Sequence, residues 1–276
     1  MINIGINPIA FSIGSIEVRW YGILVALAVL SLVLWTLREA RRVGDLSYDT
    51  VVMAALVGIP SGIVVSRLLH VIDRWDYYSQ NLGQIIGGEG LTIYGAVLGA
   101  ALAVWIYSKF SDFKFAYVAD LIAPGIILAQ AIGRVGCTIN GCCYGTATSL
   151  PWAVAYTHPN SIAFGVSGVH PTQVYEIMFL MILFVVVLML KGRLKPDGSL
   201  FLIYLGGYSL WRFGVGFIRE GTPFLFFGLH QAQVIGIIVV IITVVLMIRS
   251  RVRWAKSETI EVAPQGALGG EDDTKK

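Results

Sequence analysis

Charged residues and cysteines are both scarce in this chain of 276 residues. Aspartate, glutamate, lysine and arginine make up 13% of it, against about 25% in soluble domains. Three cysteines are too few for a disulfide-rich secreted domain. Hydrophobic residues make up 56%, which excludes a disordered chain, a collagen and a nucleic-acid-binding protein. So few charges cannot cover a soluble globule of this size, and the composition therefore predicts an integral membrane protein.

Long apolar runs account for the missing charge. A helix that crosses a membrane needs about 20 mainly apolar residues. Runs without any charge cover residues 20–37, 91–108 and 221–248. Runs with one charge each cover residues 50–72, 115–133, 172–190 and 198–217, and the charges are Arg67, Asp120, Glu176 and Arg212. The sequence therefore predicts an all-α membrane protein with seven transmembrane helices and a long loop region on one face.

Positive charge is distributed unevenly between the loops. Lysine and arginine concentrate in the loops that follow the first, third, fifth and seventh runs. The basic residues of the opposite side are Arg19, Arg74, Arg134 and Arg219. Because basic loops stay in the cytoplasm, we expect the N-terminus outside and the C-terminus inside. We also expect no removable signal peptide, one polytopic membrane domain over residues 1–254, and a disordered cytoplasmic tail over residues 255–276.

Arginines gather near the outer ends of the predicted spans, on the side that should be poor in positive charge. Arg67 and Arg212 lie inside runs, and Arg134 and Arg219 lie at run boundaries. An ionisable group inside a span costs about 2.5–3.5 kcal/mol on insertion scales, so it is a functional candidate. The planar guanidinium binds phosphate oxygens in a bidentate manner, and the cluster therefore predicts a lipid-phosphate site. The alternative is that Arg67 or Arg212 neutralises one of the two carboxylates inside the runs.

A glycine-rich segment follows the fourth run. Residues 133–145, with the sequence GRVGCTINGCCYG, are expected to form a loop in which Arg134 and Asn140 face a ligand. The alternative is a helix C-cap followed by an ordinary loop. All three cysteines lie here, and their C-x4-C-C spacing is not a familiar zinc pattern. The cysteines are expected to pack as small apolar residues, without a metal or another cofactor. A metal site that includes His158 or His170 and a disulfide remain the alternatives.

Two motifs place further polar groups at helix ends. Residues 170–176, HPTQVYE, predict a helix start at which Gln173 and Glu176 either contact a ligand or simply serve the free N–H groups. Arg212 and Arg219 are seven residues apart and share one helix face. For these arginines the alternative is an interfacial anchor.

Two tyrosines open predicted spans, and each is followed by a glycine. Tyr21 precedes Gly22, and Tyr94 precedes Gly95. The glycine leaves room beside the ring, which favours a cavity over an aromatic belt at the membrane interface. Both tyrosines are therefore candidates for the same outer-face site.

Together these motifs resemble the bacterial prolipoprotein diacylglyceryl transferase family. The matching segments occur in the family's order over roughly residues 8–250, at 11–14, 20–22, 90–99, 120–124, 133–145, 170–176 and 212–219. The resemblance implies a seven-span inner-membrane enzyme with its site on the outer face. Such an enzyme moves the diacylglyceryl group of phosphatidylglycerol to the lipobox cysteine thiol in the signal peptide of a preprolipoprotein. It forms a thioether, takes part in the first step of lipoprotein maturation, and has no nucleic-acid partner.

The resemblance also implies roles for single residues. Arg134 would bind the phosphatidylglycerol headgroup, Arg212 would be a second essential arginine, and Tyr21 would line the site. From the residues themselves we also predict that Tyr21 and Tyr94 belong to the catalytic set with these arginines. The residues expected to bind phosphatidylglycerol are Arg134, Asn140, Gln173, Glu176, Arg67 and Arg219.

Four positions depart from the family's pattern. Tyr94 replaces a histidine that is the usual candidate for a general base, so the base is not assigned. Cys137 stands where asparagine is common, and Cys142 where glutamate is common. Gly216 stands where an acidic residue is frequent. These departures leave three alternatives to an active transferase: an inactive family member, a lipid or anion transporter that uses the arginine cluster, and a cysteine-based redox protein.

Overall fold

The computed structural model describes residues 1–261 apart from 15, 45, 88–92, 221–223 and 227. The helices are α1 (Trp20–Val43), α2 (Tyr48–Asp73), α3 (Trp75–Tyr78), α4 (Gln84–Gly87), α5 (Ile93–Tyr107), α6 (Phe115–Asn140), α7 (Thr172–Leu190), α8 (Ser199–Val215) and α9 (Gln231–Glu261). Short strands join them: β1 (Ile2–Ile4), β2 (Ile9–Ile13), β3 (Ile16–Arg19), β4 (Val154–Tyr156), β5 (Phe224–Phe226) and β6 (Leu229–His230).

Among the residues that the structure describes, five helices are long and apolar enough to cross a membrane, by length and composition: α1, α2, α6, α7 and α9. A shorter apolar helix covers Gly95–Tyr107 within α5. These helices point large apolar side chains outward. Leu30, Met178 and Ile241 are 51%, 61% and 58% exposed, respectively. In water such a surface would be unfavourable, but it matches the hydrocarbon of a bilayer, as expected of an integral membrane protein.

The helix bounds confirm part of the sequence-based prediction and correct the rest. Helix α7 coincides with the predicted run 172–190. Helix α6 continues to Asn140, so the prediction of a loop from residue 133 is wrong for its first half. The helix ends where Gly141 adopts φ 78° and its N–H binds the Cys137 carbonyl, and a residue without Cβ is favoured there. Helix α9 begins at Gln231, later than residue 221, because β5 and β6 precede it.

The bundle is built from helix pairs, and one of the charges predicted inside spans, Asp120, binds backbone groups of a neighbouring helix. Helix α1 packs on α6, α2 on α5, α7 on α6, and α9 on α8. Ile127, Leu180 and Val187 are fully buried between α6 and α7. Asp120 accepts hydrogen bonds from the N–H groups of Gly198 and Phe201, at 2.8 and 2.7 Å. This carboxylate therefore caps the first turn of α8, as carboxylates do at helix N-termini.

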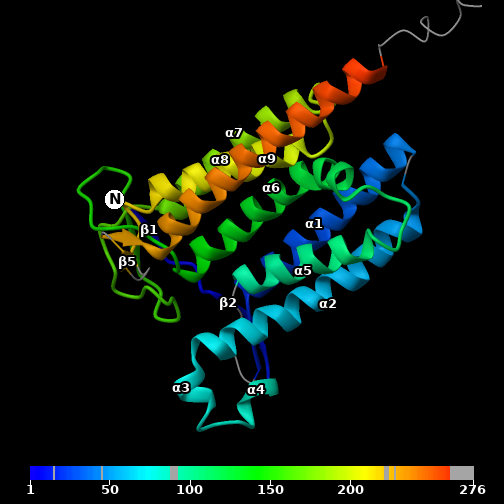
Figure 1. Cartoon of the computed structure of the whole chain (residues 1–276). Coiled ribbons are helices and arrows are strands. Elements are labelled where there is room, and N and C mark those ends of the chain that lie inside the picture. The colour runs from blue at the N-terminus through cyan, green and yellow to red at the C-terminus, as the bar shows by residue number, and fades with distance from the viewer. Residues whose placement is uncertain (15, 45, 88–92, 221–223, 227, 262–276) are drawn as a thin grey trace, which may run out of the picture.

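The two ends of the bundle differ in character. One end, called the strand end below, holds the N-terminus, the short strands, α3 and α4 (Figure 1). There β1 pairs with β4 in parallel, and β2–β3 and β5–β6 form antiparallel pairs. The other end, called the basic end, holds the α1–α2, α5–α6 and α7–α8 connections and the C-terminal part of α9 (Figure 1). The loops in which lysine and arginine concentrate thus share one end of the molecule.

Candidate active site

A buried ion pair joins three helices at the strand end. Arg134 on α6 contacts Glu176 on α7, with 3.0 Å between Nε and Oε1. The Tyr208 hydroxyl on α8 donates to the same oxygen at 2.8 Å. The Glu176 side chain is 4% exposed and that of Arg134 is 19% exposed. Since the ion pair uses Nε, it fixes the direction of the guanidinium without using its two terminal nitrogens.

Two further arginines reach this region with unsatisfied donors. Nη1 of Arg212 and Nε of Arg219 are buried and have no hydrogen-bond partner among the residues that the structure describes. The charges of Glu176, Arg134 and Arg212 all act on the Tyr208 hydroxyl. A buried charged donor without an acceptor is costly. The arrangement therefore suits an anion that would accept from these arginines, as the sequence predicts.

Polar residues at the start of α7 contact the segment 141–145, called the cysteine turn below. Oγ1 of Thr172 donates to the Cys143 carbonyl at 2.5 Å, and Nε2 of Gln173 donates to the Cys142 carbonyl at 2.7 Å. Gln173 Nε2 also lies 3.0 Å from the Tyr156 hydroxyl, and burial raises the pKa of Tyr156 to about 12. The N-cap residue Pro171 makes no side-chain hydrogen bond to α7. The Thr172 and Gln173 side chains thus contact the cysteine turn, a role that a simple helix cap does not include.

The cysteine turn is tightly held. The Gly145 N–H binds the His170 carbonyl at 2.9 Å, and a Cβ added at Gly145 would lie 2.4 Å from the Ile218 carbonyl oxygen. Only glycine fits there. Cys143 has φ 71°, a left-handed conformation that is costly for a residue with a side chain. The neighbouring Cys137 and Cys142 thiols, together with the charges of Arg219 and Arg134, hold the pKa of the Cys143 thiol below its usual range.

Three other predicted site residues, Asn140, Tyr21 and Tyr94, lie on α6, α1 and α5. Oδ1 of Asn140 accepts from Nη1 of Arg19 at 3.3 Å. Tyr21 is 39% exposed, and its Cδ2 atom would lie 3.3 Å from a Cβ added at Gly136, so α1 and α6 are close there. Tyr94 lies on α5, but its side chain is outside the described residues. The roles predicted for these residues stay predictions.

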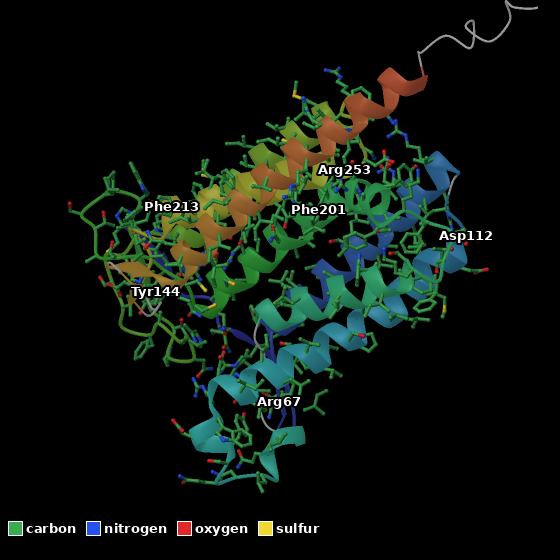
Figure 2. The ribbon with its side chains drawn as sticks, viewed as in Figure 1. Arg67, Asp112, Tyr144, Phe201, Phe213 and Arg253 are labelled. Atoms are coloured by element: carbon green, nitrogen blue, oxygen red, sulfur yellow. The ribbon has the colours of Figure 1, made fainter. Side chains whose placement is uncertain are left out.

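Arg67 has its contacts on another part of the strand end. Its Nε and Nη2 atoms donate to the carbonyls of Ile85 and Gln84 at 2.9 and 2.6 Å. Its guanidinium also lies 5.2 Å from the centre of the Tyr78 ring. Figure 2 shows Arg67 beside α3 and α4, whereas Tyr144 marks the region of the cysteine turn. The alternative that Arg67 or Arg212 neutralises a carboxylate inside the runs is therefore not observed within the described residues. Glu176 binds Arg134 instead, and Asp120 binds the N–H groups at the start of α8.

Two residues that bind site residues, Tyr208 and Arg19, are not among those predicted from the sequence. Tyr208 orients Glu176, and Arg19 binds Asn140. Tyr208 lies four residues before Arg212 and therefore shares its helix face, a spacing that could have drawn attention to it. Arg19 was counted only as a loop charge, and its partner lies 121 residues away in the chain.

The space beside Gly216 is filled by another residue. A Cβ added at Gly216 would lie 2.4 Å from Cγ of Gln233, which is 1% exposed. Gln233 is fixed at both ends of its amide: Nε2 donates to the Phe213 carbonyl at 3.2 Å, and Oε1 accepts from the His230 N–H at 2.9 Å. The glycine therefore accommodates Gln233, which explains why this chain has no acidic side chain at that position.

Gly216→Asp is expected to destabilise the protein by about 1–3 kcal/mol, the usual cost of overpacking a filled core. The double variant Gly216→Asp/Gln233→Ala should be more stable than Gly216→Asp alone, because the smaller side chain frees the volume. Thermal unfolding of the detergent-solubilised variants measures both effects. If Gly216→Asp unfolds at the wild-type temperature, Gln233 does not fill this space.

Comparisons with known proteins show the resemblance over most of the chain. A family model described as prolipoprotein diacylglyceryl transferase matches residues 8–249. A phosphatidylglycerol–prolipoprotein diacylglyceryl transferase of Dehalococcoides mccartyi is 52% identical over 245 residues, which cover 88% of this chain and 94% of that protein. Proteins of the same name from Clostridioides difficile and Listeria innocua are 39% and 34% identical, over 85% and 90% of this chain and 92% and 91% of theirs.

Proposed function

Because the chain belongs to the prolipoprotein diacylglyceryl transferase family, we propose that it moves the diacylglyceryl group of phosphatidylglycerol to the lipobox cysteine thiol of preprolipoproteins. The product is a thioether, and glycerol phosphate leaves. The observation that carries this proposal is the set of arginines at the strand end. Arg134 is oriented by Glu176, and Arg212 and Arg219 hold buried donors without partners in the described part of the chain.

The arginines suit the charge changes of this reaction. A thiolate sulfur attacks the glyceryl carbon that bears the phosphate, and the carbon–oxygen bond to the phosphate breaks. Negative charge grows on the leaving phosphate, and Arg134 and Arg212 would stabilise it more strongly in the transition state than in the ground state. Glu176 and Tyr208 act as positioning residues, since they fix Arg134 before the lipid arrives.

The proposed topology has seven spans, formed by α1, α2, α5, α6, α7, α8 and α9. The end-to-end course of these helices supports it, and so does the position of the N-terminus and the C-terminal part of α9 at opposite ends of the bundle (Figure 1). The basic end would face the cytoplasm of a bacterium, and the strand end would face outward from its inner membrane. The arginine cluster would then lie at the depth of the outer headgroups. Residues 1–254 would form the membrane domain, and α9 continues beyond it to Glu261.

The remaining assignments follow from position. Asn140 and Tyr21 would line the lipid site beside Arg134, and Gln173 would hold the cysteine turn against it. For Tyr94, at the start of α5, the proposal keeps the catalytic role that the sequence predicts. Arg67 would reach the headgroup region from the side of α4, where it contacts the Gln84 and Ile85 carbonyls.

Complementation tests the proposed function. In a bacterium depleted of its own transferase, we expect this chain to restore phosphatidylglycerol-dependent lipid labelling of a lipoprotein and Arg134→Ala to abolish it. Arg74→Ala is the matched control, because Arg74 is an exposed arginine at the same end and lies at the start of α3. Absence of labelling from well-expressed, inserted wild-type chain would contradict the proposal, and so would equal labelling by Arg134→Ala.

A further inference from the structure

The three cysteine sulfurs lie close enough to hold one metal ion. The Sγ atoms of Cys137, Cys142 and Cys143 are all within 4.8 Å of one another. By plane geometry, each then lies no more than about 2.8 Å from a common centre, and zinc–sulfur bonds are about 2.3 Å long. A shift of about half an ångström per sulfur would complete the site.

We propose that Cys137, Cys142 and Cys143 bind a zinc ion and leave its fourth position open for the thiol of the incoming preprolipoprotein. This inference rests on the proposed function, because it assigns the ion a role in preparing that thiol. It replaces the expectation from spacing alone, which treats the cysteines as packing residues. The spacing is unfamiliar because Cys137 belongs to the end of a helix and the other two belong to the turn after it.

The backbone holds the three sulfurs together before any metal binds. The Cys142 N–H binds the Cys137 carbonyl at 3.1 Å, so the turn folds back on the last turn of α6. The Cys143 carbonyl is held by Thr172. The left-handed conformation of Cys143 is unfavourable for an L-residue, and the surrounding contacts enforce it. Such strain at a residue that offers a ligand atom fits a binding site better than simple packing.

Burial leaves one side of the cluster accessible. Cys137 is buried, whereas Cys142 and Cys143 are partly exposed. Structural zinc sites are closed by four protein ligands, and catalytic sites use three and keep one position open. Within the described residues the cluster contains three metal-ligating groups, so it matches the second pattern.

The surrounding charge favours a thiolate-rich complex. Zinc with three thiolates carries a single negative charge. The charges of Arg219 and Arg134 both act on Cys143, and Nη1 of Arg134 lies 3.8 Å from the Cys137 sulfur. The same arginines that would bind the phosphate therefore neutralise the complex. This places the open zinc position beside the lipid phosphate, where the attacking sulfur is needed.

The proposed transfer on zinc involves no change of oxidation state and therefore needs no oxidant. When the substrate thiol binds zinc, its proton leaves to solvent water, and the sulfur becomes a thiolate at neutral pH. This sulfur forms a bond to the glyceryl carbon as the carbon–oxygen bond to the phosphate breaks. Glycerol phosphate departs with its charge, and the thioether, a weak ligand, leaves zinc. A tyrosine with an ordinary pKa of about 10 is a poor base at neutral pH, so the zinc would supply what Tyr94 lacks.

Metal binding is tested on the full chain purified in detergent, independently of activity. We expect about one zinc per chain by elemental analysis. Cobalt added to the metal-free chain should give intense sulfur-to-cobalt absorption in the near ultraviolet. Cys142→Ser and the triple serine variant should lose both signals, whereas His158→Gln should keep them. All cysteines of the chain lie in the cluster, so thiol titration reads this site alone.

The role of the ion is tested by removing and restoring it. Stripping zinc with a chelator should lower the rate of lipid transfer at least tenfold, and added zinc should restore it. A metal-free chain with three free thiols and full activity would overturn the zinc proposal and leave the proposed function intact, and so would a disulfide within the cluster. If the wild-type chain binds zinc but Cys142→Ser loses the zinc and keeps full activity, the open zinc position has no role in transfer. A chain that binds zinc but never transfers lipid would overturn the proposed function and with it the role given to zinc.

Discussion

Replacement of Arg134 by lysine is expected to lower kcat/KM for lipid transfer about 100-fold or more, which corresponds to about 2.7 kcal/mol of transition-state stabilisation. Lysine keeps the positive charge but offers one nitrogen. In the wild type, Nε contacts Glu176 and Nη1 lies 3.8 Å from the Cys137 sulfur, so Nη2 and the second hydrogen of Nη1 stay available for phosphate. A lysine ammonium that pairs with Glu176 would have its direction set by the carboxylate, and it could not bind two phosphate oxygens in a bidentate manner.

The measurement is transfer from phosphatidylglycerol vesicles to a lipobox peptide by purified variants. Arg74→Lys is the matched control, because Arg74 is exposed and lies in the connection between α2 and α3. Thermal unfolding of Arg134→Lys should stay near that of the wild type, since the buried charge keeps its partner. Full activity of Arg134→Lys would show that bidentate phosphate binding is not part of the mechanism.

The sequence predicted the elements of this fold better than their ends. The run 172–190 coincides with α7, because Pro171 gives a clear start and the charged loop gives a clear stop. The end of α6 was placed too early, because Gly133 and Gly136 look like loop residues. The structure shows that Gly136 instead lets α1 approach, since a Cβ there would lie 3.4 Å from Leu24 Cβ. Glycines in membrane helices let neighbouring helices approach closely in this way.

The sequence predicted which residues belong to the candidate site, but not which of them contact one another. Charges inside apolar runs identified Arg212 and Glu176, and the side of the membrane identified Arg134. Which arginine pairs with Glu176 could not be decided, because Arg134 and Glu176 lie on different helices and only packing brings them together. The cluster of three sulfurs was hidden for a related reason: its geometry depends on a helix end and on the conformation of Cys143.

Glu176→Ala is expected to be the most destabilising single change at this site, at about 3–5 kcal/mol, and to abolish transfer. It would leave the Arg134 charge without its counter-ion and the Tyr208 hydroxyl without its acceptor. Glu176→Gln should cost less, since an amide oxygen can still accept from Tyr208. Thermal unfolding in detergent gives the stability, and the vesicle assay gives the activity.

Glu39→Ala is the matched control for Glu176→Ala, because Glu39 is also buried and forms an ion pair with Lys191 at the basic end. It should lower stability by a similar amount and leave the rate per folded molecule unchanged. Adding Arg134→Met to Glu176→Ala should recover part of the lost stability, since no uncompensated charge then remains, yet it should restore no transfer. Stability and activity would then separate, as required if Glu176 supports the fold by neutralising Arg134 and supports transfer by orienting it. If the double variant is less stable than Glu176→Ala, the ion pair is not what Glu176 contributes.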